Sequence, residues 1–128
     1  TTDLNVDAYA SISERRRKFE ESGAKLLVSI HCNGYTNPEA NGTEVLYMDK
    51  KAESLARGIS YDIANSIGTV NRGAKYRGDL GLLKTTNPAI IVECGFITNS
   101  ADLAKIKTNK KAIASKIYEN IQEYYWRL

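Results

Sequence analysis

The sequence predicts one α/β domain, and two apolar runs with helical segments around them are the basis for this prediction. Residues 26–31 (LLVSIH) and 89–94 (AIIVEC) are almost continuously hydrophobic, as is typical of strands buried inside a sheet. Elsewhere, apolar residues recur at helical spacing. The length of 128 residues suits a single domain with its own core, and no repeat, linker or low-complexity segment divides it.

The first predicted helix lies directly before the first buried strand. Ser11 and Glu14 have the spacing of a capping box, in which the serine side chain accepts a hydrogen bond from the backbone three residues on. Gly23 suits the left-handed conformation that often ends a helix. We therefore expect a helix between Ser11 and Gly23.

A further strand and a helix are expected in the middle of the chain. Residues 43–48 alternate between two faces, with Glu44, Leu46 and Met48 on one of them. Helical spacing then predicts a helix that Gly68 can close, and its buried face consists of Ala52, Leu55, Ala56, Ile59 and Ile63. The stretch that follows, residues 71–88 (NRGAKYRGDLGLLKTTNP), has little periodicity and is expected to be a loop.

Two helices are expected after the last strand. Asn99 with Asp102 caps a short one, and Asn109 opens the final one. The predicted buried face of the final helix consists of Ile113, Ile117, Ile121 and Tyr124.

Each of the two buried strands ends in a residue that could carry chemistry. His31, the only histidine, ends one run, and Glu93 follows four apolar residues in the other. In open α/β sheets, ligands bind outside the carboxyl ends of the strands. If these strands are adjacent and parallel, alternation places both side chains on one face, at one cleft. A lone histidine is often only a structural group, whereas a buried carboxylate usually marks a function or a salt bridge.

The two cysteines are predicted to be buried, reduced and away from this cleft. His31 and Cys32 leave the strand in opposite directions, so a zinc site made of His31, Cys32 and Cys94 would require the strand to have ended already. Two cysteines are also too few for a disulfide framework, and they lack C-x-x-C spacing.

Composition excludes several classes of protein. No run of about 18 apolar residues exists to span a membrane, and the first residues do not resemble a secretory signal. The net charge of +3 favours an anionic partner only weakly. A nucleotide-binding α/β module is a more distant alternative, because no Gly-rich phosphate loop follows any strand. We expect no nucleic acid as a partner. Arg72, Lys75 and Arg77 lie in the predicted loop, where a substrate role and plain solubility are both open.

Several motifs together resemble those of the zinc-dependent N-acetylmuramoyl-L-alanine amidases of amidase type 3. The family's S-I-H-A-N, R-G-x-K and P-A-hydrophobic-V-E-x-G-F-hydrophobic-S-N patterns correspond in order to SIHCN, RGAK and PAIIVECGFITN in this chain. The resemblance runs from about Asp3 to the end of the chain. Cys32 replaces the family's small residue, and Thr98 replaces its serine.

The resemblance implies a larger domain than residues 1–128. The family's domain normally begins with a strand carrying Gly-His-Gly and a helix carrying a glutamate, and these supply two of the three protein ligands of the zinc. Neither motif is present, so we expect a single amidase catalytic domain without its first strand or strands and first helix. The implied fold is a three-layer α/β/α domain, phosphorylase/hydrolase-like, with a mostly parallel mixed sheet and residues 43–48 as an antiparallel edge strand.

The resemblance also implies roles for individual residues. His31 would be the third Zn²⁺ ligand, and Glu93 would move a proton from water to the leaving amine. Asn33, Arg72 and Lys75 would contact the anionic muropeptide. The protein would be a peptidoglycan hydrolase that cuts between N-acetylmuramic acid and L-alanine at the bacterial cell wall, as an autolysin or a phage endolysin. The alternative is a non-catalytic wall-binding or structural fragment, since one zinc ligand of three is present.

Overall fold

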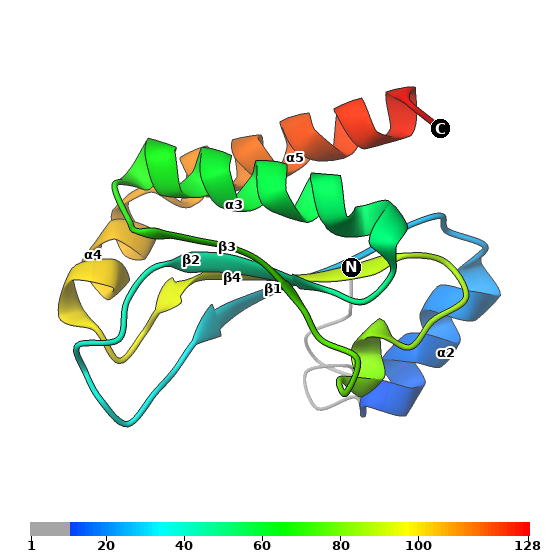
Figure 1. The fold of residues 1–128 in the computed structure, drawn as a ribbon, viewed down its shortest axis with the longest axis horizontal. Helices are drawn as coiled ribbons and strands as arrows, with labels where there is room; N and C mark the ends of the chain where they lie inside the picture. Colours follow the sequence, from blue (N-terminus) through cyan, green and yellow to red (C-terminus); the bar gives the residue numbers. More distant parts are fainter. Residues whose placement is uncertain (1–10) are drawn as a thin grey trace.

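The computed structural model describes residues 11–128, and within them a four-stranded mixed sheet forms the centre (Figure 1). The strands are β1 (Leu27–Asn33), β2 (Thr43–Tyr47), β3 (Asn71–Tyr76) and β4 (Ala89–Phe96), in the spatial order β1-β4-β2-β3. β1 runs parallel to β4, and β2 runs parallel to β3. β2 and β4 are antiparallel, which confirms a mixed sheet.

The position of β2 corrects one prediction and exposes a second error. β2 is antiparallel to β4, as expected, but it lies inside the sheet and not at its edge. Its outer neighbour is β3, which occupies residues that were predicted to be a loop. β3 is an edge strand of small and polar residues, so it lacks the apolar alternation by which strands are recognised.

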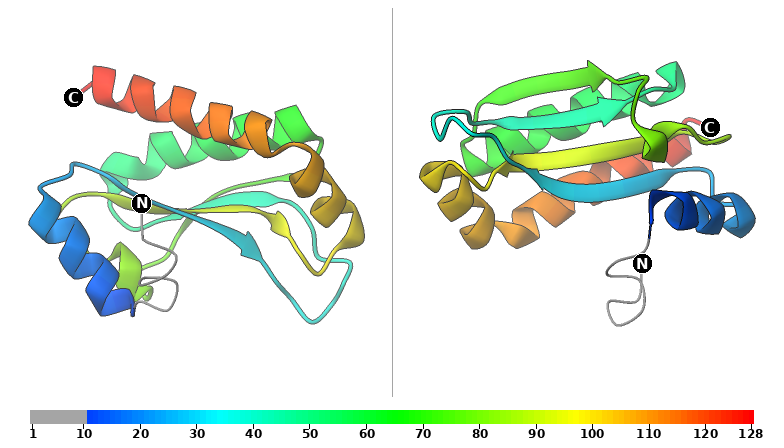
Figure 2. Two further views of the ribbon diagram at one scale, coloured as in Figure 1. Left: turned by 180° about the vertical axis from the view of Figure 1, so that it is seen from behind. Right: turned by 90° about the horizontal axis from the view of Figure 1, so that it is seen from below.

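Two long helices cover most of one face of the sheet and leave part of β1 exposed. α3 (Glu53–Ile67) and α5 (Lys110–Trp126) lie side by side across it (Figures 1 and 2). The core between these helices and the strands is the larger of the two clusters of buried apolar residues. Its fully buried members include Val45, Ile59, Ile63, Ile90 and Val92.

The opposite face is covered only in part. α2 (Ile12–Ser22) and the 3₁₀ turn η2 (Gly81–Leu83) contact each other and lie against one end of the sheet (Figure 2). A smaller cluster packs there, consisting of Leu46, Leu82, Leu83, Ala89 and Ile91. Helices on both faces confirm the α/β/α arrangement, although the layer containing α2 is incomplete over the described residues.

Local signals in the sequence set the ends of the helices. The Ser11 side chain accepts a hydrogen bond from the backbone of Glu14, and Gly23 ends α2 with a φ of 71°. Gly68 ends α3 with a φ of 81°. α4 (Ser100–Thr108) begins at Asn99, and a second 3₁₀ turn, η1 (Lys50–Ala52), precedes α3. The predicted boundaries at Ser11, Gly23, Gly68 and Asn99 are confirmed, whereas η1 was not predicted.

Asp102, in the first turn of α4, joins three segments of the chain. Its Oδ2 atom accepts hydrogen bonds from the backbone of Gly42, at 2.8 Å, and of Phe96, at 2.9 Å. Its own backbone nitrogen donates to the Asn99 side chain. The carboxylate is almost fully buried, so its hydrogen bonds replace those it would otherwise make to water. The end of β4 and the start of β2 are therefore fixed to α4.

Candidate functional site

One row of side chains crosses the open face of the sheet. His31 pairs with Glu93 between β1 and β4, and Glu93 pairs with Glu44 between β4 and β2. Residues that pair across adjacent strands point to the same face. Leu46 and Ile91, two residues away along their strands, belong to the cluster on the α2 side, so this row lies on that side too. We call His31, Glu93 and Glu44 the site row.

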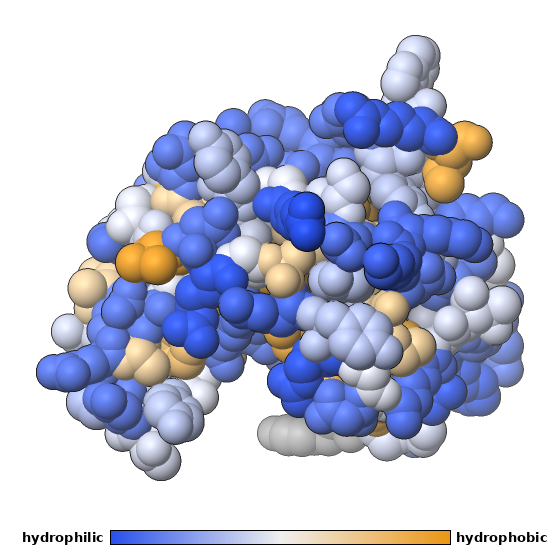
Figure 3. Space-filling view, in the orientation of Figure 1, coloured by the Kyte–Doolittle hydropathy of each residue, from blue (hydrophilic) through white to orange (hydrophobic). Residues whose placement is uncertain are grey.

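The site row lies toward the carboxyl ends of β1 and β4, beyond the area that α2 and η2 cover. Figure 3 shows the surface hollowed below the sheet, between the part formed by the loop after β1 and the part formed by η2. The parallel pairing of the two strands was predicted and is confirmed. A ligand on this face would meet the carboxyl ends of two parallel strands, where α/β sheets commonly bind their ligands.

His31 is held by its neighbour on the same strand. The Ser29 hydroxyl lies 2.7 Å from His31 Nε2, which leaves the Nδ1 atom outside this hydrogen bond. His31 is exposed overall, yet protein on one side of the ring lowers its pKa by removing water, and the positive charge of Arg15 in α2 lowers it further. The ring is therefore favoured in its neutral form, which is the form that binds metals.

Glu93 has the properties of a proton-transfer group. Its Oε2 atom is buried and has no hydrogen-bond partner within residues 11–128. Burial raises the pKa of Glu93, and the neighbouring negative charge of Glu44 raises it further. A carboxyl group whose pKa moves toward neutrality is better suited to accept and then return a proton.

Glu44 is a site residue that was not singled out from the sequence. It is 8% exposed and accepts a hydrogen bond of 2.8 Å from Asn33 Nδ2 on its Oε1 atom. Its Oε2 atom lies 3.6 Å from Arg72 Nε. The sequence did contain a signal for Glu44, because it shares a strand face with Leu46 and Met48. An acidic side chain within an apolar stripe needs a polar partner.

Of the three predicted substrate-binding residues, the structure brings two together and places the third nearby. Glu44 contacts both Asn33 and Arg72. Lys75 pairs with Leu46, which puts its exposed side chain on the same face, one row further from the end of the sheet. No ion pair of Lys75 occurs within residues 11–128.

The thiols differ from the prediction. Both are free and Cys94 is buried, as expected, but Cys32 is exposed because β1 is an edge strand of the described sheet. Burial, together with the nearby Cys32 and Glu93, raises the pKa of Cys94 to about 12. Cys94 is therefore inert at neutral pH.

The site row is not by itself a complete metal site. No group of three His, Cys, Asp or Glu side chains within residues 11–128 is arranged to hold a metal ion. A catalytic zinc needs three protein ligands. The neutral ring of His31 fits the chemistry of one such ligand, so further ligands would have to come from outside the described residues.

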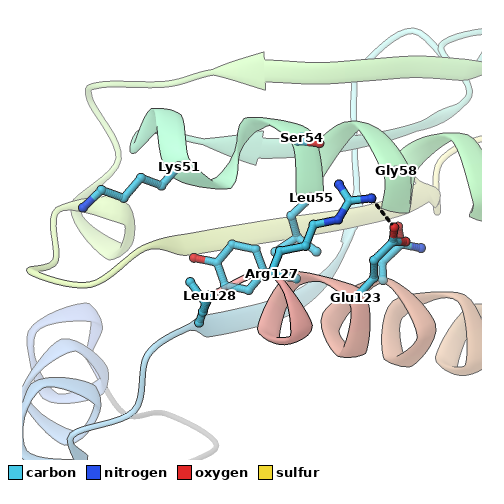
Figure 4. Close-up of a pocket in the computed structure, with 9 residues that line it drawn as sticks. Lys51, Ser54, Leu55, Gly58, Glu123, Arg127 and Leu128 are labelled. Carbon is cyan, nitrogen blue, oxygen red and sulfur yellow. Dashed lines mark hydrogen bonds and ion pairs between the residues drawn. The ribbon is translucent and has the colours of Figure 1, made fainter.

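A half-open pocket lies elsewhere, on the helical side. It has a volume of about 450 Å³ and lies between α3 and α5, with Leu55, Tyr124 and the Arg127–Glu123 ion pair in its lining (Figure 4). The sheet separates it from the site row, so it is not the predicted cleft.

No helix within residues 11–128 is both long and apolar enough to cross a membrane.

The fold and the site row together define an α/β domain with an imidazole and a carboxylate toward the carboxyl ends of two parallel strands, and a second carboxylate at the start of the antiparallel strand β2. Residues 1–123 match the family described as N-acetylmuramoyl-L-alanine amidase (Amidase_3), and the chain belongs to this family. The family assignment and the α/β fold, both expected from the sequence motifs, are thereby confirmed.

Individual relatives agree with this assignment. The N-acetylmuramoyl-L-alanine amidase LytC of Bacillus subtilis is 31% identical over 125 residues, which cover 93% of this chain and 25% of LytC. The catalytic domain of CwlV, from Bacillus (Paenibacillus) polymyxa var. colistinus, is similar with a TM-score of 0.81 and 28% identity, over 90% of this chain and 65% of that domain. The amidase AmiC2 of Nostoc punctiforme has a TM-score of 0.82 and 30% identity, over 91% and 67% respectively.

The chain spans only part of the relatives that it matches. It covers 25% of LytC and 40% of the probable cell wall amidase LytH of Staphylococcus epidermidis. Among the solved structures it covers about two thirds of the CwlV catalytic domain and of the AmiC2 chain. The shared part includes the sheet that carries the site row.

Proposed function

We propose that this chain forms the greater part of a domain that hydrolyses peptidoglycan at the bacterial cell wall. The bond cut is the amide between the lactyl group of N-acetylmuramic acid and the L-alanine of the peptide stem. Membership of the amidase family supports the reaction. The observation that carries the proposal is the pairing of His31 with Glu93 on adjacent parallel strands. It supports the proposal because an imidazole can bind a metal and a carboxylate beside it can transfer a proton.

In this proposal the cofactor is Zn²⁺, which would activate water and polarise the scissile carbonyl. His31 contributes one ligand, and Ser29 fixes the orientation of its ring. Glu93 accepts a proton from water on a carboxylate oxygen and then delivers it to the departing amine nitrogen. Its buried, unpartnered Oε2 atom and its raised pKa support this role.

A second candidate is a wall-binding or structural domain without activity. The lack of a three-ligand group within residues 11–128 favours it, because one imidazole does not hold zinc tightly. We propose instead that the remaining ligands come from outside these residues.

Zinc content and hydrolysis of purified cell wall, measured on two polypeptides, separate the two candidates. One is the 128-residue chain and the other also includes a strand and a helix ahead of Thr1, of the kind that begins the family's domain. We expect weak or no zinc binding and no peptide release from the short chain, and both properties together in the longer one, because affinity requires all ligands to be assembled. Stoichiometric zinc and full activity in the short chain would mean that the ligands are assigned wrongly. Zinc binding without peptide release in the longer one would support the inactive candidate.

A further inference from the structure

Glu44 contacts two side chains that come from the two opposite edge strands of the sheet, β1 and β3. Asn33, at the end of β1, donates to one of its carboxylate oxygens, and Arg72, in β3, lies beside the other. Glu44 itself has almost no contact with solvent. A carboxylate in this position is engaged on both oxygens, so it is better placed to orient its neighbours than to react.

The backbone of β3 bends so that Arg72 reaches Glu44. Thr43 pairs with Asn71 but Glu44 pairs with Gly73, which leaves Arg72 as an extra residue in a bulge. Gly73 has a φ of 82°, which a residue with a side chain adopts only with strain. Bulges of this kind redirect a side chain out of the regular alternation.

Other contacts hold the Arg72 guanidinium in its position beside Glu44. Its central carbon lies 5.1 Å from the centre of the Phe96 ring, a cation–π contact. The arginine stem passes over Gly42, where a Cβ atom would come within 2.8 Å of Arg72 Cδ. Nη1 lies 3.4 Å from the backbone oxygen of Asn41. In spite of these contacts, 39% of the side chain remains exposed, so the group is both oriented and open to a ligand.

We propose that Arg72 binds a carboxylate of the peptide stem beyond its L-alanine, and that Glu44 is the positioning residue for Arg72. This inference rests on the proposed function, because it takes the muramoyl peptide as the ligand. A planar guanidinium presents paired donors that match a carboxylate better than a neutral group. A group that is already oriented loses less conformational freedom on binding.

The charges of the site row give a second reason for a cation at this position. Glu44 and Glu93 are adjacent acids on the open face, and they would repel an acidic peptide. Arg72, beside Glu44, offsets this repulsion where the stem would lie, and Lys75 adds positive charge to the same face. Discrimination in favour of acidic stems therefore depends on Arg72 being held in place.

The test uses two synthetic N-acetylmuramoyl peptides that differ at one group. In one, the residue after L-alanine carries a free carboxylate; in the other, this group is a carboxamide. Calorimetric or NMR titration of the 128-residue chain should give about tenfold tighter binding of the acid, as expected for a charge-assisted contact. Arg72→Gln and Glu44→Gln should each remove most of this preference, and Arg72→Lys should retain only part of it.

Arg77→Gln is the matched control, because Arg77 lies just beyond β3 and pairs with exposed Asp79. It removes the same charge and should leave the preference intact. Melting curves identify any variant that fails to fold, and the acid-to-amide ratio would not change in a variant that is only less stable. Equal affinity for the two peptides, or no binding of either, would overturn the inference. Selective binding of the acid by a longer polypeptide that releases no peptide from cell wall would instead refute the proposed function alone.

Discussion

The two faces of the sheet use the same strands in opposite ways. On the face below α3 and α5, Val45, Ile90 and Val92 are fully buried in an apolar core. On the other face, neighbouring residues of the same strands present Glu44 and Glu93 to a partly open surface. Because successive side chains alternate, each strand contributes to stability on one side and to chemistry on the other. This comparison predicts that substitutions one residue apart should affect different properties.

The largest effect is expected on the open face, and on activity. In a longer polypeptide that hydrolyses cell wall, Glu93→Gln should reduce turnover by roughly a hundred- to ten-thousandfold, or about 3–5 kcal/mol of barrier, because the amide cannot accept a proton. Zinc should stay bound. Peptide release and metal content are the measurements, and loss of the metal together with activity would make Glu93 a ligand instead.

The next effect is expected on the face that α3 and α5 cover, and on stability. Ile90→Ala should lower the free energy of unfolding by about 2–5 kcal/mol, because it leaves a cavity at a fully buried site. Ile30→Ala is the matched control, since Ile30 is 61% exposed and its truncation should cost no more than about 0.5 kcal/mol. Urea unfolding compares the two. Similar losses would mean that β1 is buried in solution.

Two glycines allow the backbone of the two sides to be compared. Gly68 ends α3, on the helix-covered side, and Gly73 follows the bulge at Arg72. Gly68 and Gly73 both have φ near 80°, and a Cβ atom on either would meet nothing within 4 Å. Substitution by Ala should therefore lower stability by a similar amount, about 1–2 kcal/mol, through backbone strain. Only Gly73→Ala should also weaken the preference for the acidic peptide, since only it supports the bulge at Arg72. An equal loss of preference in both variants would contradict this.

The smallest effect concerns the pH dependence of stability. The raised pKa of Glu93 means that folding favours its protonated form, so its ionisation opposes folding at neutral pH. Glu93→Gln should be more stable than the parent chain at pH 7, and the difference should vanish below the pKa of the unfolded carboxyl group, about 4.3. Unfolding curves at pH 3 and pH 7 measure it. A variant that is less stable at pH 7 would show that the carboxylate has a stabilising partner.

The parts of the fold that sequence could predict are those where one pattern dominates. Apolar runs identified β1 and β4, and caps at Ser11 and Asn99 set helix boundaries, because these signals are local. β3 was missed because a polar edge strand with a bulge has no regular alternation. The error about β2 followed directly, since without β3 it was placed at the edge.

The candidate site also has a part that the sequence could predict and a part that it could not. Parity along the two strands, with the expectation that they are adjacent and parallel, predicted that His31 and Glu93 share one face, and the two residues pair directly. The role of Glu44 depends on which strand lies beside β4, and on a bulge that turns Arg72 toward it, so neither could be derived from spacing. The exposure of Cys32 was missed for a related reason, because parity gives the face of a side chain and not whether another strand covers it.

The hydrogen bonds of Asp102 have a consequence for how the domain opens. Gly42 is 60 residues away from Asp102 in the sequence, and both Gly42 and Phe96 donate their amide hydrogens to the same buried oxygen. Neither amide can exchange its hydrogen with solvent unless α4, the end of β4 and the start of β2 separate. Deuterium should therefore enter both positions at one common slow rate, that at which these three segments separate, whereas the amides at the exposed end of α5 should exchange far sooner.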